Sequence, residues 1–306
     1  MTIGHIPVLV REVLASLQPQ SEGVYLDCTV GGGGHATAIL EAAGAPSRLV
    51  GIDRDPEAIA VARDRLRHFG DRVRLIQGDY RALPLLVSDL HPEGFDGVVC
   101  DLGVSSLQFD DPSRGFSFQF EGPLDMRIDR QSGGPTARDL LHELAEKDLA
   151  RIIWTYGEER RARQIARNIV RARERRSLET TRDLAEIVAR AIPRRFWPRR
   201  IHPATRTFQA LRIAVNHELE GLEVALETAI GFLKPGGRIC VIAFHSLEDR
   251  VAKQLFRRLA APGAVPSISI LTRRPVTPSP EETARNPRAR SAKLRAAKRR
   301  ETGDGR

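Results

Sequence analysis

The chain has 306 residues, of which 41% are hydrophobic, and a formal net charge of +9. That length predicts one large or two small domains with a sizeable core. Its three cysteines, Cys28, Cys100 and Cys240, lie in apolar runs without paired spacing, which argues against disulfides and against a metal site. No apolar run approaches about 18 residues, and the N-terminus lacks an apolar signal core. We therefore expect a soluble, cytoplasmic protein without a membrane partner.

The positive charge indicates an acidic partner, most commonly nucleic acid. Arginine supplies most of this charge, so a GC-rich genome is an alternative explanation for it. The charge alone does not decide between the two.

Short apolar segments alternate with helical patterns over the first hundred residues. Strands are expected at "VYLDCT" (24–29), "RLVGID" (48–53), "VRLIQGDY" (73–80) and "FDGVVCDLG" (95–103), with helices at 35–44 and 56–70. The fourth segment is apolar nearly throughout, as strands covered on both faces are. This alternation predicts an α/β fold with a mostly parallel sheet and right-handed crossovers.

The alternation breaks after residue 107. Residues 108–134 are rich in Gly, Pro, Asp and Phe, and helical patterns without strands follow at 136–157, 158–176, 180–193 and 204–233, the last with a bend near Gly221. A fifth strand is expected in 234–246, then a helix at 247–260 and a last strand at 267–274. We therefore predict a sheet domain of residues 1–107 and 213–284 that is interrupted by a helical domain of residues 108–212.

The remaining residues, 285–306, form a basic tail. Its segment "RNPRARSAKLRAAKRR" (285–300) carries eight basic residues and no acidic one. We expect this tail to become ordered only on RNA.

Four consecutive glycines, 31–34, lie between the first predicted strand and the first helix. This is the nucleotide-cofactor position of doubly wound folds, and Gly31, Gly33 and Ala36 satisfy the pattern G-x-G-x-x-G/A. A tight turn without a ligand is the structural alternative. Asp53 ends the second strand, where a carboxylate can accept both ribose hydroxyls of an adenosine. Together these features favour an adenosine cofactor, but they do not separate NAD from S-adenosylmethionine.

Three further acidic residues stand at strand ends. Asp27 precedes the glycines, Asp79 stands with Tyr80 where an adenine ring would lie, and Asp101 follows the fourth strand. Each acid alone has another explanation, a helix cap. Together with Asp53 they favour a cationic sulfonium over a dianionic dinucleotide.

Several segments resemble the bacterial 16S ribosomal RNA cytosine-N(4) methyltransferase family over nearly the whole chain. The matching segments are "DCTVGGGGH", "GIDRDPEAI", "DLGVSS.QFDD..RGFSF...GPLDMR", "YGEER.AR.IA..IV", "HPATRTFQALRI.VN.EL", "FHSLEDR" and "NPRARSAKLR". The resemblance implies a class I, Rossmann-like fold that uses S-adenosylmethionine, with an inserted all-helical domain. It also implies a cytosine substrate in the decoding region of the small subunit.

By position, the resemblance implies a set of cofactor contacts. They are Gly33, Gly34, His35, Asp53, Tyr80, Asp101 and Gln108. Tyr80 stands where some relatives have Phe, and this change keeps the stacking face. His35 has a second explanation as a simple helix-start residue.

Asp101 is the candidate for contact with the reacting amine. Amino-methyltransferases often carry a D/N-P-P-Y/F tetrad at this strand end, whereas this chain has "DLGVSS". A role for Asp101 in cofactor binding alone is the alternative. His245 is a second catalytic candidate, and a hydrogen-bonded histidine that closes a strand is the more ordinary explanation.

A cytosine must leave its stack to enter such a pocket. Four aromatic residues that follow Asp101 either stack on the base or form a small core: Phe109, Phe116, Phe118 and Phe120.

Two groups of arginines are candidates for RNA binding. Arg163 and Arg167 recur on one face of the predicted helix 158–176, although a solvated helix face is the ordinary explanation. The second group surrounds Phe196 and Trp197, an arrangement that suits RNA phosphates and bases. It consists of Arg194, Arg195, Arg199 and Arg200.

The sequence thus predicts an S-adenosylmethionine-dependent rRNA methyltransferase acting on a cytosine amine. Its expected partner is 16S rRNA within the 30S subunit, and it acts as a monomer or homodimer without a metal. An NAD-linked oxidoreductase and a non-catalytic RNA-binding assembly factor are the alternatives.

Overall fold

The computed structural model describes residues 7–175, 178–199 and 201–301. The chain forms two compact units. The first, which we call the α/β unit, consists of Met1–Gly103 and Gly221–Arg306, and the second, the helical unit, of Val104–Glu220. Within the described ranges, no helix combines the length and the apolar character that crossing a membrane requires.

The helical unit extends beyond the predicted insert of residues 108–212 at both ends. The predicted limit at 212 would cut α10, which runs without interruption over Thr205–Asn216. This helix buries Phe208 and Leu211 in the core of the helical unit, and it ends only at His217, whose φ is 52°. The apolar periodicity of the sequence continues past residue 212 without a break. It therefore does not mark where the helical unit ends, and the predicted limit was wrong.

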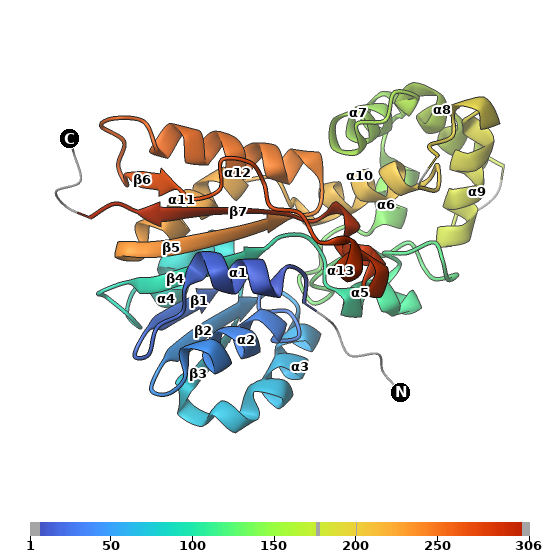
Figure 1. The fold of residues 1–306 in the computed structure, drawn as a ribbon. Helices are drawn as coiled ribbons and strands as arrows, with labels where there is room; N and C mark the ends of the chain where they lie inside the picture. The colour runs from blue at the N-terminus through green and yellow to red at the C-terminus, as the bar shows by residue number, and fades with distance from the viewer. Residues whose placement is uncertain (1–6, 176–177, 200, 302–306) are drawn as a thin grey trace. The chain divides into compact units, whose positions relative to one another are not determined.

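A seven-stranded sheet with the order β3-β2-β1-β4-β5-β7-β6 organises the α/β unit (Figure 1). Its strands are β1 (Val24–Asp27), β2 (Arg48–Asp53), β3 (Val73–Gln77), β4 (Phe95–Asp101), β5 (Leu233–Ala243), β6 (Ile268–Ile270) and β7 (Lys293–Arg299). The first five strands pair in parallel, while β7 runs antiparallel to both β5 and β6. The predicted mostly parallel α/β sheet is therefore confirmed.

Helices cover the sheet on both faces, as parallel strands require. The α/β unit contains α1 (Val10–Leu17), α2 (Gly34–Ala43), α3 (Pro56–Leu66), α4 (Leu83–Val87), α11 (Leu222–Gly231), α12 (Ser246–Leu259) and α13 (Pro280–Arg285). It also contains the 3-10 turns η1 (Arg67–Arg72), η2 (Tyr80–Ala82) and η5 (Pro287–Ser291). The first three helices share one hydrophobic core with the sheet, whereas α11 packs against α4 and α12. The predicted helix 204–233 is thus two helices, α10 and α11.

The expectation of a tail that orders only on RNA is wrong for residues 293–299. These residues form β7, which lies between β5 and β6 in the sheet. Leu294, Ala296 and Ala297 are fully buried there, and Arg295 donates a hydrogen bond from Nε to Asp249 Oδ1 at 2.7 Å. The density of basic residues hides the three small or apolar side chains that fix this strand.

The helical unit is built from short helices around its own core. They are α5 (Ser106–Asp110), η3 (Pro112–Arg114), α6 (Ala137–Glu143), α7 (Glu146–Gly157), α8 (Ala162–Arg173), α9 (Thr181–Ala191), η4 (Arg194–Phe196) and α10. On α8 the side chains of Ala162, Ile165 and Ile169 are buried at helical spacing, as their periodicity predicts. The charged face of α8 points away from that core.

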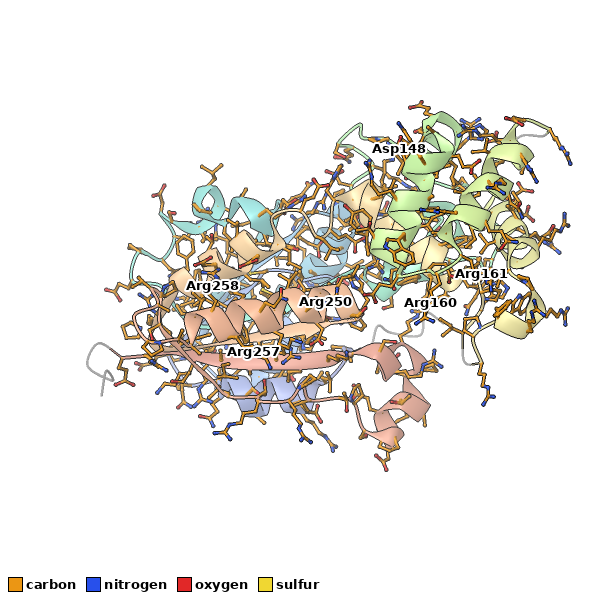
Figure 2. All side chains as sticks on the ribbon, turned by 90° about the horizontal axis from the view of Figure 1, so that it is seen from above. Asp148, Arg160, Arg161, Arg250, Arg257 and Arg258 are labelled. Atoms are coloured by element: carbon orange, nitrogen blue, oxygen red, sulfur yellow. The ribbon has the colours of Figure 1, made fainter. Side chains whose placement is uncertain are left out.

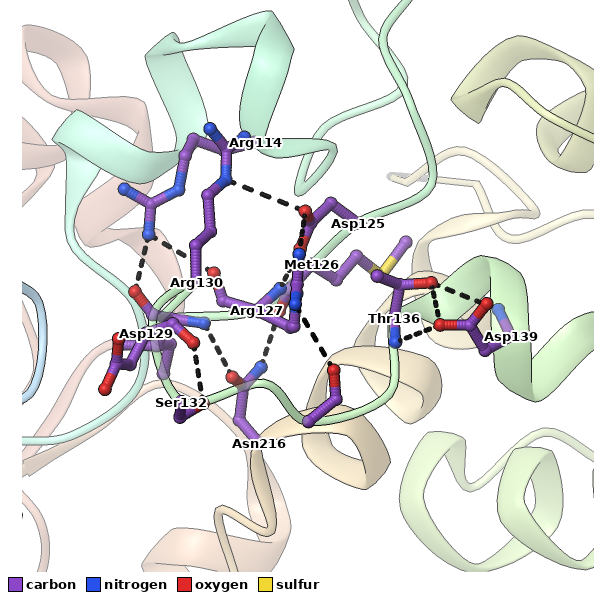
Figure 3. A network of polar contacts seen from close by, with 12 residues as sticks. Arg114, Asp125, Met126, Arg127, Asp129, Arg130, Ser132, Thr136, Asp139 and Asn216 are labelled. Atoms are coloured by element: carbon purple, nitrogen blue, oxygen red, sulfur yellow. Dashed lines mark hydrogen bonds and ion pairs between the residues drawn. The ribbon is translucent and has the colours of Figure 1, made fainter.

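The Gly- and Pro-rich loop of the helical unit is anchored by a polar network (Figure 3). Asn216, which is 3% exposed, donates from Nδ2 to the carbonyl of Met126 at 2.7 Å and accepts from the N–H of Ile128 at 2.7 Å. Arg114, also buried, donates from Nη2 to the carbonyl of Ile128 at 2.7 Å. These bonds satisfy buried backbone groups that have no strand or helix partner, and Met126 is held at a φ of 61°.

Candidate functional site

Three carboxylates end neighbouring strands at one edge of the sheet. Asp27, Asp53 and Asp101 are the last residues of β1, β2 and β4. In the pairing register, Asp27 lies beside Gly51 on one side and Val99 on the other. The chain leaves β1 toward β2 and β3 and returns to the opposite side of β1 as β4. Ligands of doubly wound sheets bind at such a reversal, outside the carboxyl ends of the strands.

The glycine loop follows β1 at this edge. Gly31 and Gly33 have φ values of 51° and 78°, a region that favours glycine. A Cβ on Gly33 would lie 3.2 Å from Leu66 Cδ1, and one on Gly34 would lie 2.9 Å from Pro7 Cγ. The positive φ of Gly33 and the close approach of Pro7 to Gly34 therefore favour glycine at these positions, whether or not a ligand lies on the loop.

Asp53 connects the glycine loop to β2. Its Oδ2 accepts the N–H of Gly31 at 2.8 Å, and its Oδ1 accepts the N–H of Asp55 at 2.9 Å. Burial raises the pKa of Asp53 to about 6, although both backbone bonds act in the opposite direction. Each carboxylate oxygen retains a lone pair for a further donor. A pair of hydroxyls, as on a ribose, fits this arrangement.

Asp27, His35 and Asp101 form a buried polar cluster. Asp27 and His35 are 1% and 5% exposed, and His35 Nε2 lies 3.6 Å from Asp101 Oδ2. Among the described residues, no hydrogen-bond partner exists for Asp27 Oδ2, Asp101 Oδ1 or either ring nitrogen of His35. A buried polar atom without a partner costs about 1–3 kcal/mol. The cluster therefore fits a ligand that brings positive charge and hydrogen-bond donors.

The members of this cluster influence one another's protonation. Burial raises the pKa of Asp27 to about 7, while His35 and the N–H of Thr29 favour its ionised form. Burial disfavours charge on His35, but Asp101 and Asp27 outweigh this effect and raise its pKa. The N–H of Asp101 donates to Thr29 Oγ1 at 2.6 Å, which ties the end of β4 to the segment after β1. The positions of the residues in the cluster therefore determine how strongly each one affects the protonation of the others.

Two neighbouring arginines contact the carboxylate of Asp79. Its Oδ1 accepts the N–H of Arg81 at 2.9 Å, and Arg54 Nε lies 3.3 Å from its Oδ2. Burial opposes ionisation of Asp79, but the bonds from Arg81 lower its pKa. Asp79 is therefore the cap of η2 and an ion-pair partner, which is the alternative considered for each strand-end acid. Tyr80, half-buried at the start of η2, remains the residue at this strand end that can stack on a ring.

His245 has a structural role at the start of α12. Its Nδ1 accepts the N–H of Glu248 at 3.3 Å, and Glu248 Oε2 accepts the N–H of Phe244 at 2.9 Å. His245 Nε2 lies 3.1 Å from Glu248 Oε1. His245 and Glu248 thus form the capping box of α12. His245 is therefore a hydrogen-bonded histidine that closes a strand, which is the more ordinary of its two explanations.

Gln108 belongs to the helical unit, where its side chain is 4% exposed. Gln108 Oε1 accepts the N–H of Ser105 at 2.9 Å, and the two residues form the capping box of α5. Its contact with a cofactor stays a prediction.

The four loop phenylalanines divide between two environments. Phe116 is buried in the core of the helical unit, and Phe109 and Phe118 pack against that core. Phe120 is 54% exposed. The core explanation therefore accounts for three of the residues, and only Phe120 is exposed.

Exposed arginines and aromatic rings gather around η4. Arg161, the residue before α8, is labelled in Figure 2. Its Cζ lies 3.7 Å from the centroid of the Phe196 ring. Arg195 Cζ lies 4.9 Å from the same ring, and Arg194 Cζ lies 5.3 Å from that of Trp197. Arg161 is not among the predicted RNA contacts, because 35 positions separate it from Phe196 and no local sequence pattern connects them.

The other arginines that were predicted to contact RNA differ in their surroundings. Arg163 and Arg199 are exposed, and Arg167, also exposed, has its Nε 3.6 Å from Glu146 Oε1. Arg200 lies outside the described residues.

Comparison with known proteins gives consistent matches. The sequence profile of the MraW methylase family matches residues 2–300. A protein of Geobacter sulfurreducens named "Ribosomal RNA small subunit methyltransferase H" is 53% identical, over 97% of this chain and 99% of its own. A protein of Heliobacterium mobile with the same name is 47% identical, over 97% and 99%. Among solved structures, precorrin-6y C5,15-methyltransferase from Geobacter metallireducens covers 95% of this chain and 87% of its own, with a TM-score of 0.44 at 11% identity.

Proposed function

The chain belongs to the MraW methylase family, and on that premise we propose that it methylates the exocyclic N4 amine of a cytosine in 16S ribosomal RNA, at the decoding region. The observation that carries the proposal is the cluster of Asp27, His35 and Asp101. In it, Asp27 Oδ2, Asp101 Oδ1 and both ring nitrogens of His35 lack hydrogen-bond partners among the described residues. A cationic methyl donor at the carboxyl ends of β1 and β4 would supply the missing partners.

The site residues fit S-adenosylmethionine. When bound, this cofactor supplies an activated methyl group on a positively charged sulfur. Asp53 offers both carboxylate oxygens to ribose hydroxyls, and Tyr80 offers a ring face to adenine. Asp27 offers the partnerless Oδ2 to the amino group of the methionine moiety. Gly33, Gly34, His35 and Gln108 complete the proposed contacts.

Asp101 has the chemistry that the amine needs. The lone pair of the cytosine amine is delocalised into the ring, and a carboxylate that accepts one of its hydrogens localises that pair on nitrogen. A bound S-adenosylmethionine would supply the methyl group, and Asp101 would take up the proton that the amine nitrogen gives up. His35 Nε2 lies 3.6 Å from Asp101 Oδ2, which is longer than a hydrogen bond. Alignment of the two reactants is worth about 7–11 kcal/mol in such a displacement.

The RNA surface that we propose lies on the helical unit around η4. Arg161, Arg194 and Arg195 each lie over the face of Phe196 or Trp197, and Phe196 is 48% exposed. Arginines beside exposed rings suit phosphates and unstacked bases. Arg163, Arg199 and Arg200 extend the positive charge in the sequence. Arg194→Gln combined with Arg195→Gln should weaken RNA binding and reduce its salt dependence, by about 0.7 units of slope for each lost phosphate contact with a single strand.

Transfer of a tritiated methyl group to 30S subunits that lack the modification tests the function. We expect incorporation at one cytosine N4, and we expect assembled subunits to be better substrates than naked 16S rRNA. Absence of transfer, together with NADH binding, would favour the oxidoreductase. RNA binding without any transfer would favour an assembly factor. We further propose that the enzyme acts in the cytoplasm as a monomer or homodimer, which sedimentation at several concentrations tests.

A further inference from the structure

A polar cavity lies at the junction of β5 and α12. Its volume is about 260 Å³, and polar side chains from three segments of the α/β unit line it. They are His245, Ser246, Thr277, Arg290, Ser291 and Lys293. Two of the sequence segments that matched the family, "FHSLEDR" and "NPRARSAKLR", meet here, and the site described above uses neither.

Strand pairing brings these segments together. Ala243, the last residue of β5, pairs with Lys293, the first residue of β7. An isolated bridge between Val276 and Leu294 places the segment of Thr277 along the other side of β7. Ala289 and Ala292 are buried on either side of Arg290 and Ser291. The cavity is thus fixed by the sheet and by two buried anchors.

The lining is positive and rich in hydrogen-bond donors. No acidic residue lines the cavity, and none of the described residues hydrogen-bonds to or forms an ion pair with the guanidinium of Arg290. Lys293 Nζ lies 3.4 Å from Asp249 Oδ2, but Asp249 also accepts a hydrogen bond from Arg295. One carboxylate therefore faces two cations, and the charge of the cavity remains positive. Cations combined with hydroxyl groups are typical partners of phosphate oxygens.

The cavity lies at the same sheet edge as the proposed reaction centre. Asp101 pairs with Ile242, and the next residue of β5 pairs with Lys293 on β7. Neighbouring strands are about 4.8 Å apart, so the Cα of Lys293 lies roughly two strand spacings, about 10 Å, from the Cα of Asp101. On this spacing we place the backbone of a nucleotide whose base lies at Asp101 near the cavity.

We propose that this cavity binds a phosphodiester of the RNA strand beside the target cytosine. Arg290 and Lys293 neutralise the phosphate, while Ser246, Thr277 and Ser291 supply hydroxyl groups. The contact fixes the strand so that the extruded base enters the pocket at Asp101. The inference rests on the proposed function and adds an RNA contact within the α/β unit.

The first test compares Arg290→Gln with Arg285→Gln. Both arginines are exposed in the same C-terminal segment, but Arg285 does not line the cavity. In binding titrations with a 16S rRNA fragment spanning the decoding region, Arg290→Gln should weaken affinity about 10-fold and lower the salt slope by about 0.7. Arg285→Gln should match the wild type. Equal effects of the two changes would show a general charge effect and overturn the inference.

The second test neutralises the phosphate instead of the arginine. Fragments with one methylphosphonate linkage, placed 5′ or 3′ to the target cytosine, should bind the wild type about 10-fold more weakly at one of the two positions. The same linkage should cost nothing further in Arg290→Gln, because the two changes remove one contact. Full additivity, or no effect at either linkage, would overturn the proposal. If inorganic phosphate at millimolar concentration displaces the fragment from Arg285→Gln, which keeps the site, no more than from Arg290→Gln, which lacks it, the site is likewise rejected.

Methyl transfer separates this inference from the function on which it rests. If wild-type protein transfers no methyl group to 30S subunits, the proposed function fails whatever the variants do. If the wild type is active and Arg290→Gln shows an unchanged RNA concentration for half-maximal rate, only the phosphate site fails. The expected result is a higher half-maximal RNA concentration with unchanged affinity for S-adenosylmethionine.

Discussion

The backbone N–H of Gly31 donates to Asp53 Oδ2 at 2.8 Å, so the carboxylate that ends β2 also holds the glycine loop. The other oxygen of Asp53 accepts the N–H of Asp55, the cap of α3. One side chain thereby fixes the conformation of two loops that face the proposed cofactor. Asp53 therefore has two roles, in the shape of the pocket and in ribose binding.

Asp53→Ala should weaken binding of S-adenosylmethionine by about 1.5–3 kcal/mol, the range for hydrogen bonds to a charged group. Calorimetry measures this change. Asp55→Ala is the matched control, because Asp55 accepts the N–H of Glu57 as a helix cap. The control should lower the free energy of unfolding by about 0.5–2 kcal/mol and leave cofactor affinity near the wild-type value. Unchanged affinity in Asp53→Ala would reject the ribose assignment.

Asp101→Asn should lower turnover by about 10²–10⁴-fold, the range for positioned proton-transfer groups, because an amide is a weaker proton acceptor than a carboxylate. RNA binding should change little. Single-turnover rates at saturating S-adenosylmethionine measure the effect. A near-normal rate under those conditions, with a raised cofactor dissociation constant, would mean that Asp101 only binds the cofactor.

Affinity for S-adenosylmethionine should rise as the pH increases through about 6 to 7. In the protein alone, burial raises the pKa of Asp53 to about 6 and that of Asp27 to about 7. Both acids must ionise to hold a cation and its hydroxyls, so binding releases protons in that window. Calorimetry in two buffers of different ionisation enthalpy measures the release. Asp27→Asn should remove the upper part of the dependence, and a flat profile in the wild type would contradict the assignment.

The same two acids should oppose folding as the pH rises. Their pKa values are above the ordinary value of 3.8, so the folded protein binds more protons than the unfolded chain between about pH 4 and 7. Their contribution to the free energy of unfolding is largest below about pH 4 and is lost as the pH passes 6 to 7. Denaturant titrations of Asp27→Asn and wild type across this range measure the difference.

Asn216→Ala should destabilise the helical unit. It leaves the carbonyl of Met126 and the N–H of Ile128 without their partner inside the polar network of Figure 3. Each such group costs about 1–3 kcal/mol when buried. Urea titration measures the loss, with Arg163→Ala, on the exposed face of α8, as a control expected to stay within about 0.5 kcal/mol. Equal stability of the two variants would show that the network contributes nothing.

Removal of residues 293–306 should prevent cooperative folding of the α/β unit, because β5 and β6 both lose their hydrogen-bonded neighbour. Removal of residues 301–306 retains all of β7 and should leave the thermal transition nearly unchanged. Circular dichroism during heating compares the two. A normal transition in the shorter protein would contradict the central place of β7.

The sequence predicted those strands and helices whose residues show a clear local hydrophobic pattern. The apolar runs before Asp27, Asp53 and Asp101 form the expected strands, and the order of strands and helices placed their carboxylates at one edge. The continuous periodicity at the junction of 204–233 hid the end of α10, and the basic side chains of 293–299 hid β7. Both depend on packing against residues far away in the sequence.

The site shows the same division. A strand-end position predicted Asp79 beside the adenine ring, and the structure adds ion pairs of this residue with Arg54 and Arg81 that the sequence did not reveal. Sequence spacing did not reveal Arg161 over the ring of Phe196, because that contact joins two helical segments. Which acids remain available, and which rings are covered, follows from contacts that only the three-dimensional structure contains.

The place of β7 between β5 and β6 also governs when the protein can fold during synthesis. The strand that joins these two neighbours is the last one to leave the ribosome, so no earlier portion of the chain contains a finished sheet. The helical unit is one continuous segment, Val104–Glu220, in which α7 contacts both α8 and α10, so all of its contacting helices leave the ribosome before β5. The nascent chain therefore has a completed helical unit while the two halves of the sheet still wait for residues 293–299, and during that interval β5 exposes an apolar edge that a chaperone is suited to cover.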